Sequence, residues 1–119
     1  MKFFTEEQER QMRANGAENA KRSASGADTI DFEPVVKLFC PWGEPIWLLT
    51  ELDPEDPDVA FGLCDLGMGF PELGNVRLSE IFAVRGPGRL RIERDLHFMP
   101  TKTLSAYAEE ARRAGCVQA

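Results

Sequence analysis

Carboxylates, one histidine and one arginine are the side chains of this sequence that could do chemistry. Paired carboxylates perform acid–base chemistry when one of them is buried and the other lies in a polar environment. Glu51 and Asp65 stand at the ends of two predicted strands and could converge in this way, although the sequence does not place them side by side. A small hydrolase-type enzyme that uses Glu51, Asp65 or His97 is therefore one hypothesis. The candidate binding residues are Trp42, Glu51, Asp53, Asp65, Glu72, Arg94 and His97.

The motifs that usually accompany catalysis or metal binding are missing from the sequence. His97 is the only histidine, and strand alternation places it with Asp95 and Glu93 on a wet face, where a surface ion network is expected. The three cysteines share no close spacing, which excludes the usual zinc motifs. The acidic stretch 51–58 could bind a hard cation, but its prolines interrupt the ligand spacing, so we expect a solvated loop. With no serine elbow and no phosphate loop, the sequence predicts no catalytic residue, no metal and no cofactor, and it favours a protein that is not an enzyme.

Arg94 lies between Ile92 and Leu96, in phase with the apolar residues of a predicted strand. A buried guanidinium cannot lose its proton and is costly to leave unpaired. Its planar fork fits a carboxylate in a bidentate manner. We therefore expect a partly buried ion pair, and we favour a structural role over a binding role for it. The acids that strand order places best are Glu51, Asp53, Asp65 and Glu72.

The charge is unevenly distributed along the chain. The net charge is −6, which disfavours direct nucleic-acid binding through a broad basic surface. Segment 44–80 carries nine acidic residues and one basic residue, whereas segment 85–94 carries four arginines and one glutamate. These blocks either pair within the fold or form a two-signed surface for a protein partner.

Two hypotheses without catalysis follow from the charge pattern. The first is a module that binds an unidentified protein or peptide. Trp42, at the tip of a predicted hairpin, would be an exposed anchor for it, since large exposed apolar groups mark interaction sites. The second is an acidic DNA mimic that inhibits a DNA-binding protein, which the acidic block favours and the arginines disfavour.

Hydrophobic periodicity predicts the elements that position these residues. Thr5 and Gln8 form a capping box for a helix that we expect to dock lightly and to stop at Asn15-Gly16. Short apolar runs predict strands at 35–40, 46–52, 59–65, 75–78 and 90–98. Ser79 and Thr103 are predicted N-caps of a short helix, 80–85, and of a C-terminal helix that ends at Gly115. In the third strand, Gly62 marks a bulge or a close backbone approach.

The predicted fold is a single small α+β domain with an antiparallel sheet of about five strands. An N-terminal and a C-terminal helix flank the sheet, and one short helix lies between strands. We divide the chain into residues 1–27, a helix and linker, and residues 28–119, the core domain. The sequence has no apolar run long enough to span a membrane and no secretory leader, and its three cysteines fit a reducing cytoplasm.

Five short motifs in a fixed order carry a resemblance. They are VVKLF (35–39), WLLTELD (47–53), FGLCDLG (61–67), FPELG (70–74) and IERDLHF (92–98). In these motifs the chain resembles a bacterial family of small proteins that is catalogued as a domain of unknown function and is often encoded on plasmids and other mobile elements. The resemblance covers about 33–98 and continues through 104–109. It implies a bacterial cytoplasmic protein, and it implies no activity and no functional residue.

Overall fold

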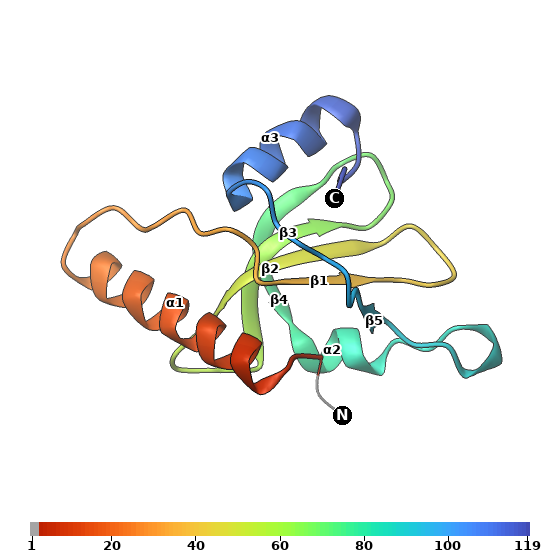
Figure 1. The fold of residues 1–119 in the computed structure, drawn as a ribbon, viewed down its shortest axis with the longest axis horizontal. Coiled ribbons are helices and arrows are strands. Elements are labelled where there is room, and N and C mark those ends of the chain that lie inside the picture. The colour runs from red at the N-terminus through yellow and green to blue at the C-terminus, as the bar shows by residue number, and fades with distance from the viewer. Residues whose placement is uncertain (1–2) are drawn as a thin grey trace.

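A five-stranded sheet with the order β4-β3-β2-β1-β5 organises the chain in a computed structural model that describes residues 3–119 (Figure 1). Every neighbouring pair of strands is antiparallel. The strands are β1 (Val36–Phe39), β2 (Ile46–Leu52), β3 (Val59–Asp65), β4 (Glu72–Arg77) and β5 (Glu93–Arg94). The helices are α1 (Glu6–Ala24), α2 (Leu78–Ala83) and α3 (Leu104–Ala114), with a short 3-10 helix η1 (Pro87–Arg89). The predicted α+β class and its antiparallel sheet are confirmed.

The sheet separates two apolar cores, with α3 on one side and α1 and α2 on the other (Figure 1). Successive side chains of a strand point to opposite faces, so one strand feeds both cores. Leu48 of β2 packs with Leu63 and Tyr107 in the core beneath α3. Its neighbours Trp47 and Leu49 belong to the larger core that α1 and α2 cover.

A bulge at Thr50 changes the phase of β2. Leu49 pairs with Gly62 and Glu51 pairs with Phe61, so Thr50 is an extra residue in the strand. The extra residue places Leu52 on the same face as Leu49, and both are buried in the larger core. Strict alternation would have turned Leu52 to the opposite face. Opposite the bulge, a methyl group on Gly62 would lie 2.0 Å from the Leu48 carbonyl oxygen, so the predicted close backbone approach is confirmed.

The prediction that α1 ends at Asn15-Gly16 and docks lightly is wrong. The capping box of Thr5 and Gln8 starts the helix as expected, but the helix continues for 19 residues. Met12 is fully buried, and Phe3 and Phe4, which precede the helix, are buried in the same core. The pair does not stop the helix because both of its residues are buried against β2. Asn15 donates to the Thr50 carbonyl oxygen at 2.9 Å, and Gly16 lies against Leu52.

Two predicted strand ranges are corrected. The fourth strand begins earlier than expected, at Glu72, because β4 pairs with β3 from Val59 to Cys64, and α2 follows directly at Leu78. The fifth strand contains only two residues instead of 90–98, because a tight loop after α2 carries the chain away from the sheet until Ile92. Leu96, which alternation assigned to the core, is therefore exposed.

Aspartates from distant segments hold the first turns of α2 and α3. Thr103 occupies the predicted N-cap position of α3, although its side chain makes no capping hydrogen bond. The predicted Ser79 cap is wrong, because α2 starts at Leu78, two residues earlier than expected. Asp58 instead accepts hydrogen bonds from the backbone and hydroxyl of Ser79 at 3.0 and 2.7 Å. Asp31 accepts the equivalent bonds from Ser105. The C-terminal end of α3 is as predicted, with Gly115 at φ 81°.

We predict that Gly16→Ala destabilises the protein by about 2–3 kcal/mol, the usual cost of overpacking. Alanine normally stabilises a helix relative to glycine, so a loss of stability on this substitution is the opposite of the usual effect. The cause is that a methyl group at this position would lie 1.8 Å from the Leu52 carbonyl oxygen. Urea unfolding measures the difference.

Gly74→Ala is the matched control, because a methyl group there meets no atom within 4 Å. It should leave the free energy of unfolding nearly unchanged. A Gly16→Ala variant as stable as the wild type would contradict the docking of α1 on β2.

Candidate functional site

A groove of about 840 Å³ lies between the β1–β2 turn, the β3–β4 loop, β5 and the segment after α3. Three of the seven predicted site residues, Asp65, Arg94 and His97, line it. The groove carries charges of both signs. Its ionisable lining residues, cysteines aside, are Lys37, Glu44, Asp65, Glu93, Arg94, Asp95 and His97.

Asp65 is a structural anchor at the floor of this groove. Asp65 is only 2% exposed, and both of its carboxylate oxygens accept hydrogen bonds. One oxygen accepts a hydrogen bond from the backbone amide of Gly67 at 2.8 Å, and the other accepts one from the amide of Val117 at 2.9 Å. The carboxylate therefore ties the β3–β4 loop and the C-terminal segment to the end of β3.

Asp95 and Lys37 form the ion pair at the groove wall. The backbone amide of His97 donates to Asp95 at 2.9 Å, and the Lys37 ammonium lies 3.4 Å from the same carboxylate. These two contacts, the amide first, hold the pKa of Asp95 below its ordinary value. The His97 ring is exposed, and the hydrogen bond that His97 contributes to the expected surface network comes from its backbone amide.

The predicted ion pair between Arg94 and a carboxylate is wrong. Its Nη1 donates to the backbone carbonyl of Phe3 at 3.0 Å, and no carboxylate of residues 3–119 pairs with it. The Phe3 carbonyl is available because α1 and the residues before it pack against the sheet. The side chain is half-buried at the border of the groove and a second hollow of about 450 Å³.

Three arginines line that second hollow, which we call the arginine pocket: Arg89, Arg91 and Arg94. The Arg91 guanidinium stacks on the Phe82 ring at 4.0 Å and donates to the Phe82 carbonyl at 3.1 Å. Its Nε is buried without a hydrogen-bond partner in the described chain. Arg89 follows Gly88 in a tight turn, and the two residues have φ values of 68° and 64°. A left-handed arginine costs roughly 1–2 kcal/mol.

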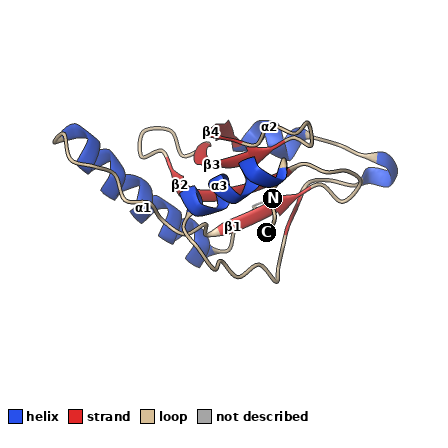
Figure 2. Cartoon of the chain, turned by 90° about the horizontal axis from the view of Figure 1, so that it is seen from above, coloured by secondary structure: helices blue, strands red, loops and turns tan. Residues whose placement is uncertain are grey.

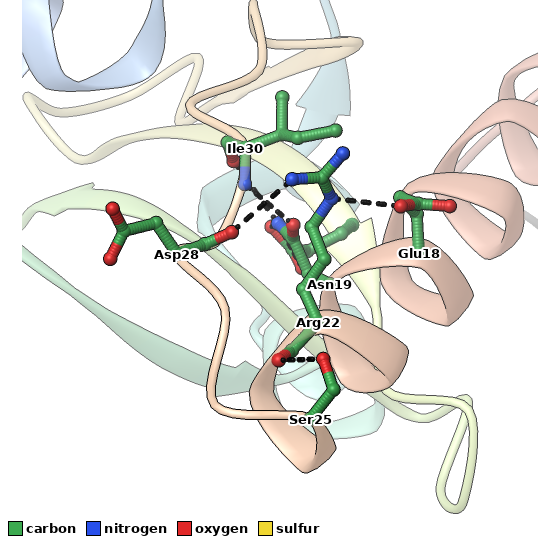
Figure 3. A network of polar contacts seen from close by, with 7 residues as sticks. Glu18, Asn19, Arg22, Ser25, Asp28 and Ile30 are labelled. Carbon is green, nitrogen blue, oxygen red and sulfur yellow. Dashed lines mark hydrogen bonds and ion pairs between the residues drawn. The ribbon is translucent and has the colours of Figure 1, made fainter.

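Glu51 lies away from the groove, in a polar cluster between α1 and β2. The Asn19 amide donates to both carboxylate oxygens of Glu51, at 3.1 and 3.2 Å. Figure 3 shows the same Asn19 joined to Ile30, which donates to it at 2.7 Å through its backbone amide. Burial raises the pKa of Glu51, and the bonds from Asn19 and Thr50 offset only part of this effect. The cluster fixes the helix and its following segment to the sheet.

The remaining predicted residues lie apart from one another. Trp42 is half-buried rather than fully exposed, because its indole covers Gly86, where a methyl group would meet the ring at 2.5 Å. Asp53 is exposed and accepts the Glu55 amide in a local turn. Glu72 is exposed on β4. The structure therefore brings together Asp65, Arg94 and His97 and separates them from the other four.

The prediction missed an apolar surface on the β3–β4 loop. Met68 and Phe70 are 69% and 79% exposed, and Leu66 and Leu73 lie exposed beside them. Together with β4 they surround a hollow of about 410 Å³. The signal was present in the sequence, since segment 66–74 has three glycines and still carries four large apolar residues, which is unusual.

Within residues 3–119 no group of three or more histidine, cysteine, aspartate or glutamate side chains could hold a metal ion. The acidic loop does not converge on a cation site. Its Asp56 and Asp58 instead pair with Arg77 at 3.1 and 3.3 Å. In the described part of the chain, no helix is both long enough and apolar enough to cross a membrane.

The sheet with helices on both faces, a two-signed groove and an exposed apolar loop define a small α+β domain with several ligand-accessible surfaces. The chain belongs to the family described as "Protein of unknown function (DUF2958)", whose model matches residues 3–118. No curated protein sequence and no solved structure matches the chain. The family covers the whole fold and assigns no activity to any of its surfaces.

We predict that Asp65→Ala destabilises the protein by about 3 kcal/mol, because it leaves the amides of Gly67 and Val117 without their charged acceptor. Asp65→Asn should cost less, since it keeps one acceptor oxygen. Urea unfolding gives the free energies, and faster hydrogen exchange at Val117 reports the release of the C-terminal segment. The exposed Asp53→Ala is the control and should cost below about 1 kcal/mol; equal costs would refute the anchoring role of Asp65.

We predict that Glu51→Gln removes a pH dependence of stability. The folded-state pKa of Glu51 is raised, so its stabilising contribution is present at low pH and is lost as the pH rises from the ordinary value of 4.5 through the folded-state pKa. The wild type should therefore lose stability relative to Glu51→Gln between acidic and neutral pH. Unfolding at a series of pH values measures this, with the exposed Glu55→Gln as control. Parallel curves for the wild type and Glu51→Gln would contradict the prediction.

Proposed function

We propose that this protein is a non-enzymatic binding module that takes an extended segment of another protein along the free edge of β4. The exposed apolar surface of the β3–β4 loop, directly beside that edge, is the observation that carries the proposal. The three free cysteines and the family resemblance support a setting in the bacterial cytoplasm, in a plasmid or mobile-element system.

The edge of β4 offers backbone groups for pairing. β4 pairs only with β3, and Figure 2 shows it at the outer edge of the sheet. The Leu78 amide donates to the Asp58 carbonyl at 2.7 Å, which sets the phase of the β3–β4 ladder. Because hydrogen-bonded pairs alternate in an antiparallel ladder, the outward groups are those of Leu73, Asn75 and Arg77. The Val59 amide and carbonyl, opposite Arg77, bond to Asp56 and Asp53, which agrees with this phase.

The apolar loop supplies side-chain contacts for the same ligand. An added strand obtains affinity from backbone bonds and specificity from pockets that receive alternate side chains. The hollow between Met68, Phe70 and Val76 lies next to the outward groups of β4 and is large enough for one or two apolar side chains. An open edge beside exposed apolar residues would otherwise promote aggregation, which favours a dedicated partner.

The charge around β4 indicates the chemistry of the partner. Segment 44–80 contains nine acidic residues and one basic residue, and that one, Arg77, already pairs with Asp56 and Asp58. A segment with apolar residues and interspersed lysine or arginine complements this surface. A second copy of the chain fits less well, because each copy has a net charge of −6.

The two other hypotheses receive less support. A DNA mimic needs a continuous acidic face, and the neutralised Arg77 cluster and the arginine pocket interrupt it. Acid–base catalysis by two carboxylates needs both groups to be accessible and to lie in environments that give them different pKa values. The Glu51 carboxylate is held by Asn19, and both Asp65 oxygens are held by backbone amides.

Selection from short random peptides tests the proposal. Peptides selected on the wild type and counterselected on a Met68→Ser/Phe70→Ser variant should show alternating apolar residues with lysine or arginine between them. A selected peptide should bind this variant about tenfold more weakly or worse, since a buried aromatic anchor dominates such contacts. It should slow hydrogen exchange at Leu73, Asn75 and Arg77 and leave the inward amide of Val76 unchanged.

Met99→Ser is the matched control, because Met99 is 80% exposed and Phe70 is 79% exposed. It should bind the selected peptide as the wild type does. The proposal fails if no consensus emerges, if the double variant binds equally well, or if protection appears away from β4. It also fails if the wild type is a dimer that Phe70→Ser converts to a monomer, which would assign the edge to a second copy.

A further inference from the structure

We infer that the arginine pocket is a second binding site, which takes carboxylate side chains from an acidic, partly apolar segment of a protein. This inference does not depend on the proposed function of β4. The two surfaces lie at opposite edges of the sheet, since β4 and β5 are its two outer strands. A substitution in one surface should therefore leave binding at the other unchanged.

The four arginines of segment 85–94 differ from most other arginines of the chain in their partners. Arg13, Arg22, Arg77, Arg112 and Arg113 each form an ion pair with a carboxylate. Among residues 3–119 no carboxylate pairs with Arg85, Arg89, Arg91 or Arg94, although the protein is acidic overall. Glu93 also lines the pocket, and it pairs with none of them. The positive charges of these arginines are therefore available to pair with carboxylates of a ligand.

Contacts fix the guanidinium groups of Arg91 and Arg94 in advance, whereas Arg89 is constrained only at its backbone. Arg94 is held through Nη1 by the Phe3 carbonyl, so its other nitrogens remain available. Arg91 lies over the Phe82 ring and donates to the Phe82 carbonyl, and its buried Nε lacks an acceptor in the described chain. The turn at Gly88 keeps Arg89 in the left-handed region, where a glycine would be free of strain. A strained residue at an exposed turn indicates a role other than stability.

The lining favours a protein ligand over a nucleic acid. Beside the arginines stand Leu90, Ile92 and the exposed Leu96, which suit leucine-like side chains between acidic ones. Single-stranded nucleic acids require exposed aromatic rings for base stacking, and the only aromatic residue of the lining, Phe3, is buried. The net charge of −6 also repels a long polyanion, whereas one or two carboxylates meet only the local field.

Fluorescence anisotropy with the full chain tests the site. The probe is a labelled short peptide of alternating glutamate and leucine. Two comparison ligands are measured beside it: the same peptide with glutamine in place of glutamate, and a labelled oligothymidylate of equal charge. The acidic peptide should bind, and its affinity should fall as salt is added. The two comparison ligands should not bind. Arg94→Ala and Arg89→Ala should each weaken binding about tenfold, as expected for a lost charge-assisted bond. Arg113→Ala, which removes the same charge from α3, should have no effect.

Arg89→Gly separates a binding role from a structural one. Glycine relieves the left-handed strain, so this variant should unfold at a higher urea concentration than the wild type and still lose the peptide. If Arg89 had only a structural role, its replacement would lower the stability to urea and the peptide affinity together. This variant also keeps the test valid if Arg94→Ala does not fold.

Three results would overturn the inference. The first is a wild type that does not bind the acidic peptide. The second is equal binding by Arg89→Gly and the wild type. The third is tighter binding of the oligothymidylate than of the peptide, which would assign the pocket to nucleic acid. A Phe70→Ser variant should keep full peptide affinity, so failure at β4 and failure here are distinguishable.

Discussion

The extra residue at Thr50 is the constraint on which the rest of the structure depends. It turns both Leu49 and Leu52 toward the larger core, and it leaves the Thr50 carbonyl to be satisfied from outside the ladder. Asn15 supplies that hydrogen bond, and Gly16 allows the helix backbone to approach β2 closely enough for it. The docked helix in turn brings Phe3 to Arg94. A local irregularity in one strand thereby sets the geometry of the arginine pocket.

Much of the acidic composition serves the backbone of distant segments. Asp31 and Asp58 hold the first turns of α3 and α2, and Asp65 holds the β3–β4 loop and the C-terminal segment. A carboxylate that accepts amide hydrogen bonds is strongly favoured in its charged form. The Ser79 hydroxyl and amide accordingly lower the pKa of Asp58. These acids join elements of the fold that the sheet alone does not connect.

The two unpartnered surfaces differ in chemistry as well as in position. The β4 edge combines open backbone groups with an apolar loop in an acidic setting, whereas the arginine pocket combines cations with leucines. Among the described residues, no ion pair joins the two charge blocks noticed in the sequence. Arg77 pairs with the acidic loop, but the arginines of 85–94 remain apart from it. The two proposed sites would therefore take segments of opposite charge.

The sequence by itself determined the elements whose cause is local. The bounds of β2 and β3, the capping box of α1 and the glycine that ends α3 follow from runs, caps and turns within a few residues. Only the tertiary structure decided the length of α1, the brevity of β5 and the partner of Arg94. Each of these depends on a group far away in the chain: β2 buries Gly16, the loop after α2 diverts β5, and the Phe3 carbonyl replaces the expected carboxylate. Hydrogen-bond partners are chosen by proximity in space, which residue types and their spacing do not encode.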